Sequence, residues 1–117
     1  MIKNFYRNKY NAEVRLEGIR LLKATCRNII RRSREAEGAY GHVKCSFKKA
    51  NDLFRSIISH KRLFDKWLEQ TEIFMEKGND KCLRPVIDRI DEKGHYYLYN
   101  MQVLSLSENA SKARKKN

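Results

Sequence analysis

The chain has 117 residues, a length that suits one domain and is too short for two full hydrophobic cores. Hydrophobic residues make up 41% of it, charged residues 34%, and there is one proline, which favours solvated helices over a β-sandwich. Lysine and arginine outnumber aspartate and glutamate by 26 to 14, so the net charge is +12. A polyanion such as nucleic acid is the natural partner of this surplus, although a ribosome-like or simply soluble basic protein has the same composition.

The cysteines and the hydropathy indicate the compartment. Cys26, Cys45 and Cys82 are odd in number and widely spaced, without a C-x-x-C pair. This pattern predicts a reducing compartment and neither a disulfide framework nor a cysteine zinc site. The first residues lack the apolar region of a signal peptide, and no stretch reaches the apolar length of a membrane span. We therefore expect a cytoplasmic protein that does not associate with membranes.

The first predicted element is a long basic helix over residues 11–37. Apolar residues recur every three or four positions there, and Gly38 is a plausible stop. The opposite face is rich in arginine, which makes it either a phosphate-binding face or a merely solvated one. The candidate phosphate contacts on this helix are Arg27, Arg31, Arg32 and Arg34.

Two further amphipathic runs, over 47–59 and 63–77, predict helices. Ser46 is the expected N-cap of the first run, and Gly78 ends the second. The joint near His60 contains neither glycine nor proline, so the runs form either two helices or one bent helix. Their aromatic residues are more typical of a core than of a base-stacking platform.

After Gly78 the pattern predicts strand, loop, strand and helix. A β-branched run follows Pro85, which suits the first residue of a strand because proline cannot donate to a ladder. A turn-rich loop over 91–100 separates this run from a second short strand, and Ser107 is the expected N-cap of a final basic helix. We therefore predict an α+β, mostly helical fold, in which helices of a basic region over 1–83 pack with a module over 84–117 as one compact unit.

The module carries an ordered set of unusual residues. It contains Asp-Arg-Ile-Asp at 88–91, Gly94 in the loop, Asn100 before the second strand and Glu-Asn at 108–109 opening the helix. In this order and spacing it resembles the ββα-metal unit of HNH endonucleases, in particular a branch of phage and homing endonucleases. The resemblance covers about the last 33 residues and implies a phage or mobile-element setting, hence the host-cell cytoplasm.

Asp88 and Asn109 are the candidate metal ligands. A hairpin brings the end of one strand near the first turn of the following helix, so a carboxylate and an amide oxygen there can converge on one hard cation. Few oxygen ligands, completed by water and phosphate, favour Mg²⁺ or Mn²⁺ over zinc. Taken singly, the same residues are ordinary turn and helix-start residues. Asn100 corresponds to the middle asparagine of the family's name, and we expect it to brace the loop through backbone hydrogen bonds.

The catalytic base is the point where the chain departs from the family. Arg89 stands where better-known members place a histidine, and arginine cannot act as a base, so it can only orient phosphate or stabilise charge. His95 is the candidate replacement if the loop folds back toward Asp88, and Asp91 is the second candidate.

Three functions are open at this point. The first is a Mg²⁺-dependent endonuclease acting on nucleic acid, with DNA favoured over RNA. The second is a catalytically weak or inactive HNH-derived protein that binds nucleic acid or inhibits a nucleoprotein machine. The third is a basic protein with an acidic protein partner. The further nucleic-acid contacts expected in the last helix and tail are Lys112, Arg114 and Lys115.

Overall fold

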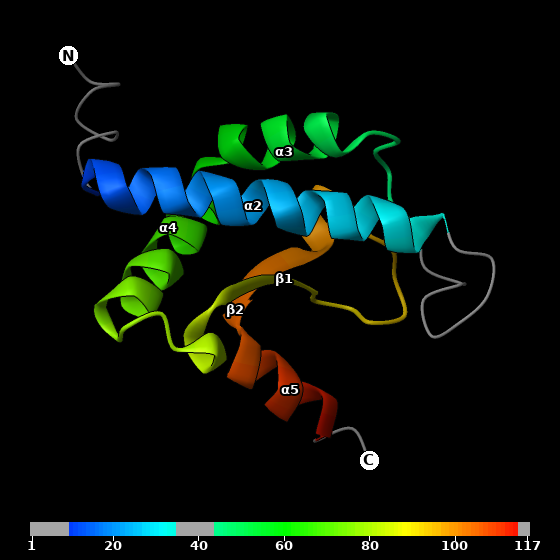
Figure 1. The fold of residues 1–117 in the computed structure, drawn as a ribbon. Helices are drawn as coiled ribbons and strands as arrows, with labels where there is room; N and C mark the ends of the chain where they lie inside the picture. Colours follow the sequence, from blue (N-terminus) through cyan, green and yellow to red (C-terminus); the bar gives the residue numbers. More distant parts are fainter. Residues whose placement is uncertain (1–9, 35–43, 115–117) are drawn as a thin grey trace.

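The computed structural model of the chain describes residues 10–34 and 44–114. The fold is α+β and mostly helical, as predicted, and Figure 1 shows α3 along one side of α2, with the β-hairpin and α5 on the other. The elements in chain order are α2 (Ala12–Ser33), α3 (Ala50–Ser59), α4 (Lys61–Glu76), the 3-10 turn η1 (Lys81–Leu83), β1 (Pro85–Arg89), the 3-10 turn η2 (Leu98–Asn100), β2 (Met101–Ser105) and α5 (Leu106–Arg114).

The long helix α2 begins with a side-chain cap. Asn11 precedes it and accepts a hydrogen bond from the backbone N–H of Val14 through Oδ1, at 2.9 Å. This bond satisfies one of the N–H groups that a helix start leaves without a partner. The helix ends at Ser33, and the predicted stop at Gly38 lies outside the described residues.

Trp67 joins α4 to α2 in the core. Its side chain is fully buried, and its Nε1 donates to the backbone oxygen of Gly18 at 2.8 Å. A Cβ at Gly18 would stand 2.7 Å from Cδ2 of Leu68, so the two helices approach closely because position 18 has no side chain. The prediction that this aromatic residue belongs to the core is confirmed.

The joint near His60 separates two helices. His60 follows α3 with extended backbone, and its Nδ1 accepts from the backbone N–H of Leu63 at 3.2 Å, which caps α4. The prediction of Ser46 as the N-cap of α3 is wrong: Lys49 occupies that position. Ser46 instead donates through its backbone N–H to the oxygen of Tyr96 at 2.9 Å, and so ties the chain before α3 to the loop of the hairpin.

The hairpin shares one core with the helices. β1 and β2 pair antiparallel, with Pro85 opposite Ser105 at the open end. Ile87 and Met101 of the hairpin belong to the same buried cluster as Leu22 of α2 and the indole of α4. Because this cluster crosses the predicted division at residue 84, the two predicted regions form one hydrophobic core.

Helix α5 begins with a reciprocal cap two residues earlier than predicted. Ser105 Oγ accepts from the backbone N–H of Glu108 at 3.1 Å, and the Glu108 carboxylate accepts from the backbone N–H of Ser105 at 2.9 Å. The prediction of Ser107 as the cap is therefore wrong. The spacing of Ser105 and Glu108 is that of a capping box, in which two N–H groups are satisfied at once.

We expect Ser105→Ala to lower the free energy of unfolding by about 1 kcal/mol, because the Glu108 N–H loses its acceptor. Ser107→Ala is the matched control, since this exposed hydroxyl accepts from no helix N–H. Chemical denaturation followed by circular dichroism measures both variants. Equal losses in the two variants would contradict the assignment of the cap to Ser105.

The structure also describes the state of the cysteines and the apolar character of the helices. Cys26, Cys45 and Cys82 are free thiols. Burial raises the pKa of the Cys26 thiol to about 12 and also raises the pKa of Cys45. Over the described ranges, no helix has both the length and the apolar character that crossing a membrane requires.

Candidate functional site

A cavity of about 520 Å³ lies between α2, β1 and α5. We call it the basic groove, because four cationic side chains line it against two carboxylates. The cations are Arg32, Arg84, Arg89 and Lys112, the carboxylates are Asp88 and Glu92, and the uncharged polar lining residues are Thr25, Asn28 and Asn109.

The periodicities of the elements bring these side chains together. Residues 84, 86 and 88 share one face of the extended chain, because side chains alternate along a strand. On α5, Asn109 and Lys112 are three positions apart and therefore lie on one face of the helix. Asn28 and Arg32, four positions apart on α2, line the groove from the other side in the same way.

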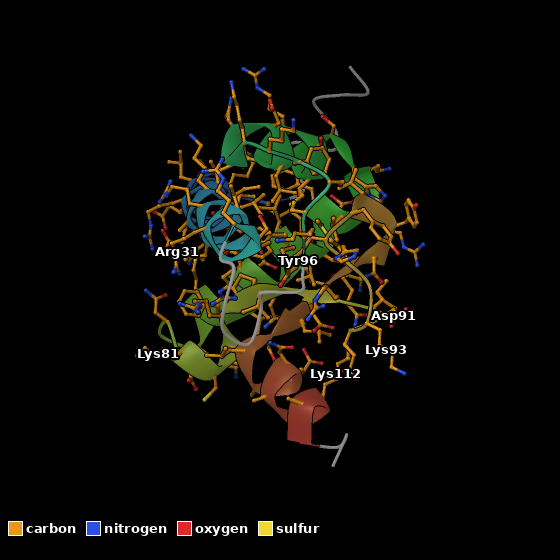
Figure 2. All side chains as sticks on the ribbon, turned by 90° about the vertical axis from the view of Figure 1, so that its right-hand side faces the viewer. Arg31, Lys81, Asp91, Lys93, Tyr96 and Lys112 are labelled. Carbon is orange, nitrogen blue, oxygen red and sulfur yellow. The ribbon has the colours of Figure 1, made fainter. Side chains whose placement is uncertain are left out.

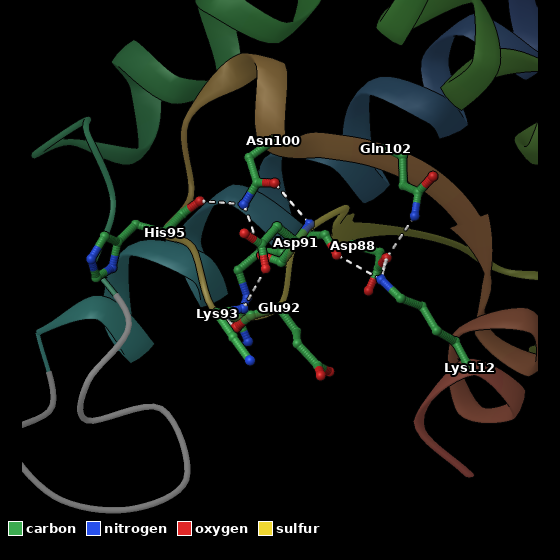
Figure 3. Close-up of polar contacts among 9 residues, drawn as sticks. Asp88, Asp91, Glu92, Lys93, His95, Asn100, Gln102 and Lys112 are labelled. Atoms are coloured by element: carbon green, nitrogen blue, oxygen red, sulfur yellow. Dashed lines mark hydrogen bonds and ion pairs between the residues drawn. The ribbon is translucent and has the colours of Figure 1, made fainter. Parts of the chain in front are cut away.

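Two of the groove-lining residues, Asp88 and Lys112, form an ion pair. Lys112 Nζ lies 2.6 Å from Asp88 Oδ2 and also donates to the backbone oxygen of Arg89 at 2.7 Å (Figure 3). Gln102 Nε2 donates to the same carboxylate oxygen at 2.9 Å. The Asp88 side chain is 12% exposed and that of Lys112 26%, so water screens this pair less than a surface pair.

In this arrangement an ammonium group lies beside the carboxylate that was predicted to hold a metal ion. Asp88 and Asn109 line the same groove, as their predicted role requires, but the Asp88 carboxylate already faces an ammonium group. Nowhere in 10–34 or 44–114 do three histidine, cysteine, aspartate or glutamate side chains gather as metal ligands. Mg²⁺ requires a near-octahedral set of oxygens. Here it would meet the Asp88 carboxylate paired with Lys112, the carboxylate of Glu92 and the positive charge of Arg84 and Arg89.

Asn100 holds the loop over 91–99 from inside. Its side chain is buried and makes three hydrogen bonds to the loop backbone (Figure 3). Oδ1 accepts from the N–H of Asp91 at 2.8 Å, and Nδ2 donates to the oxygens of Asp91 at 3.1 Å and His95 at 2.9 Å. These are contacts of the kind expected for a brace. Gly94 is required beside it, because a Cβ there would stand 2.9 Å from Asn100 Nδ2.

Arg89 closes the same loop from the strand side. Its Nη1 donates to the backbone oxygens of Glu92 at 2.6 Å and Gly94 at 2.9 Å. Its guanidinium carbon lies 5.5 Å from the centre of the Tyr96 ring. Arg89 therefore lines the groove as a fixed positive charge whose position the loop determines.

The two candidate bases are differently placed. His95 Nδ1 accepts from the backbone N–H of Lys44 at 2.9 Å, and Figure 3 shows its imidazole on the far side of the loop from Asp88. Asp91 Oδ1 accepts from the N–H of Lys93 at 3.0 Å within the loop turn. The structure thus brings together Asp88, Arg89, Asn109 and Lys112, but not His95.

The other predicted phosphate contacts are spread over the surface. Arg27 lines a separate hollow beside α3, and Arg34 Nη2 donates to the backbone oxygen of Lys48 at 2.7 Å. Arg31 lies exposed on α2 (Figure 2). Arg114 is the last residue of α5. The prediction for Lys115 falls outside the described residues.

Four of the charged and uncharged polar residues named in the groove were not predicted from the sequence: Arg84, Glu92, Thr25 and Asn28. The sequence does contain a signal for Arg84. This residue is two positions before Val86 and four before Asp88, so it shares their face of the extended chain. Thr25 and Asn28 lie seven and four positions before Arg32 on α2, which also places them on one helix face. Only the packing of α2 against the hairpin makes that face part of the groove.

Comparison with protein-family models, with curated proteins and with solved structures found no match to this chain.

Proposed function

We propose that the basic groove binds the phosphate backbone of a nucleic acid, DNA in the first instance, and that this binding needs no metal ion. In this proposal β1, β2 and α5 act as a unit with the shape of an HNH-like ββα module. The Lys112 ammonium, instead of a metal ion, lies beside the Asp88 carboxylate. The observation that supports it is the Lys112–Asp88 ion pair in the lining of a groove where cationic side chains outnumber carboxylates.

The groove offers two kinds of phosphate contact. Arg32 and Arg84 supply charge, and phosphate binding to such side chains releases counterions from the nucleic acid. Thr25, Asn28 and Asn109 supply uncharged donors, which commonly bond to phosphate oxygens and fix orientation without reading sequence. Such a groove supports binding that is sensitive to salt and largely indifferent to sequence.

Binding to DNA that does not depend on a metal ion distinguishes this proposal from a metal-dependent endonuclease. We expect the dissociation constant for a labelled DNA duplex, measured by fluorescence anisotropy, to change less than about twofold between EDTA and a low concentration of Mg²⁺, because the fixed cations are side chains. Supercoiled plasmid incubated with the protein in Mg²⁺ or Mn²⁺ should stay intact. Binding that appears only with the metal, or cutting that EDTA stops, would refute it.

A metal-dependent endonuclease is the second candidate. It is favoured by the position of Asp88 and Asn109 in the same groove. In this candidate the Lys112 ammonium must move away from Asp88. The catalytic base is then Asp91, or His95 after its imidazole has turned away from Lys44. In the plasmid assay this candidate predicts cutting that Asp88→Ala and Asn109→Ala abolish.

A further inference from the structure

A second cavity, of about 410 Å³, lies between α4 and the β2 side of the hairpin. We call it the tyrosine cavity. Its lining includes Arg62 and Lys66 of α4, Ile90 just after β1, Tyr99 of η2 and Gln102 of β2.

Tyr99 presents an aromatic ring to solvent at this cavity. It is 84% exposed, and Ile90 beside the same cavity is 53% exposed. The Tyr99 ring lies against that of Tyr97, with ring centroids 4.5 Å apart. The neighbouring Asn100 is buried and bonded to the loop backbone, which fixes the turn that carries Tyr99. An exposed ring on a fixed turn loses little conformational entropy when another ring stacks on it.

The charge around this ring favours a polyanion. Arg62 and Lys66 are four positions apart on α4 and so lie on the same face of the helix. Among the described residues that line the cavity, none is acidic. Lys66 has an ion pair with Glu69 at 3.6 Å, but both side chains are more than half exposed, and such surface pairs contribute little.

The tyrosine cavity adjoins the basic groove through one side chain. Gln102 lines the tyrosine cavity, and its Nε2 donates to the Asp88 carboxylate, which lines the groove. This hydrogen bond links the linings of the two cavities.

We infer that the tyrosine cavity takes an unpaired base of the bound nucleic acid, which stacks on Tyr99 while Arg62 and Lys66 hold the adjoining phosphates. This inference rests on the proposed phosphate binding in the groove. Its consequence is a preference for a duplex interrupted by unpaired nucleotides over a continuous one, because only an unpaired base exposes both faces to a protein ring.

The test compares two DNA duplexes of the same sequence, one continuous and one with a short single-strand bulge, by fluorescence anisotropy at low salt. We expect the wild-type protein to bind the bulged duplex more tightly. Tyr99→Ala should weaken that binding about 10-fold and leave binding to the continuous duplex unchanged, since stacking on an aromatic side chain is lost only where a base is unpaired. Tyr99→Phe should retain the preference.

A crosslink gives a positional readout. With 5-iodouracil in the bulge, irradiation of the complex should crosslink Tyr99, identified by mass spectrometry.

Leu16→Ala is the matched control for the affinity measurements, because Leu16 is a 69% exposed apolar side chain on α2 that lines neither cavity. The Leu16→Ala variant should bind the bulged and the continuous duplex as tightly as the wild-type protein does.

The outcomes separate this inference from the function on which it rests. Equal binding of the two duplexes, or equal losses on both with Tyr99→Ala, overturns the inference and leaves phosphate binding in place. Failure to bind any DNA or RNA at low salt overturns both, and would favour an acidic protein as the partner of the two surfaces.

Discussion

Replacement of Arg32 and Arg84 together by glutamate should weaken duplex binding about 100-fold at low salt. The two side chains line the basic groove from α2 and from the residue just before β1. Each reversal removes an attraction to phosphate and adds a repulsion, and a 100-fold change corresponds to about 2.7 kcal/mol. The logarithmic salt dependence of the affinity should fall by about 2, because two phosphate contacts are lost. Anisotropy titrations over a series of salt concentrations measure both quantities.

The matched control reverses the same number of charges elsewhere. Lys48 and Arg55 are exposed residues that line neither the basic groove nor the tyrosine cavity, and Arg55 belongs to α3, across α2 from α5 (Figure 1). Their joint replacement by glutamate changes the net charge equally. A comparable loss of binding in this control would show that the overall charge of the protein, and not the groove, determines the affinity.

Asn100→Ala should lower the free energy of unfolding by about 3 kcal/mol. The substitution leaves the N–H of Asp91 and the oxygen of His95 without the side chain that now satisfies them, while the oxygen of Asp91 still accepts from the N–H of Gly94. An unsatisfied polar group costs roughly 1–3 kcal/mol when buried, and the loop lets water reach part of this site. The expected fall in melting temperature is about 10 °C for a chain of this size.

Asn51→Ala is the control for this prediction, because Asn51 is an exposed amide near the start of α3. It should change the free energy of unfolding by less than about 0.5 kcal/mol. Asn100→Asp adds a second comparison. A carboxylate can still accept from the Asp91 N–H but cannot donate to either oxygen, so this variant should also be destabilised. Stability equal to wild type in Asn100→Asp would show that the two donated bonds contribute nothing.

The elements of the fold followed from local patterns. The recurrence of apolar residues predicted α2 and α4, and the β-branched run after Pro85 predicted β1. The caps were harder to predict, because a serine occurs near several possible helix starts. The choice between Ser105 and Ser107 was decidable in principle, since Glu108 lies three positions after Ser105 and completes a capping box.

The composition of the site was less predictable than its position. The order of hairpin and helix indicated that Asp88 and Asn109 would lie near each other, and both line the groove. The pairing of Asp88 with Lys112 depends on the angle at which α5 packs on β1, which no local pattern determines. The partner of His95 is the backbone of Lys44, 51 positions away, so no pattern within the loop indicated where the imidazole would point.

The most direct test of the proposed function is an NMR titration of the ¹⁵N-labelled protein with a short DNA duplex in EDTA. Binding in the basic groove predicts progressive shifts of the backbone amides of Arg84, Asp88, Asn109 and Lys112, which line it, with little change at the exposed residues of α3. Shifts confined to residues outside the groove, or no shifts until Mg²⁺ replaces EDTA, would contradict metal-independent phosphate binding at this site.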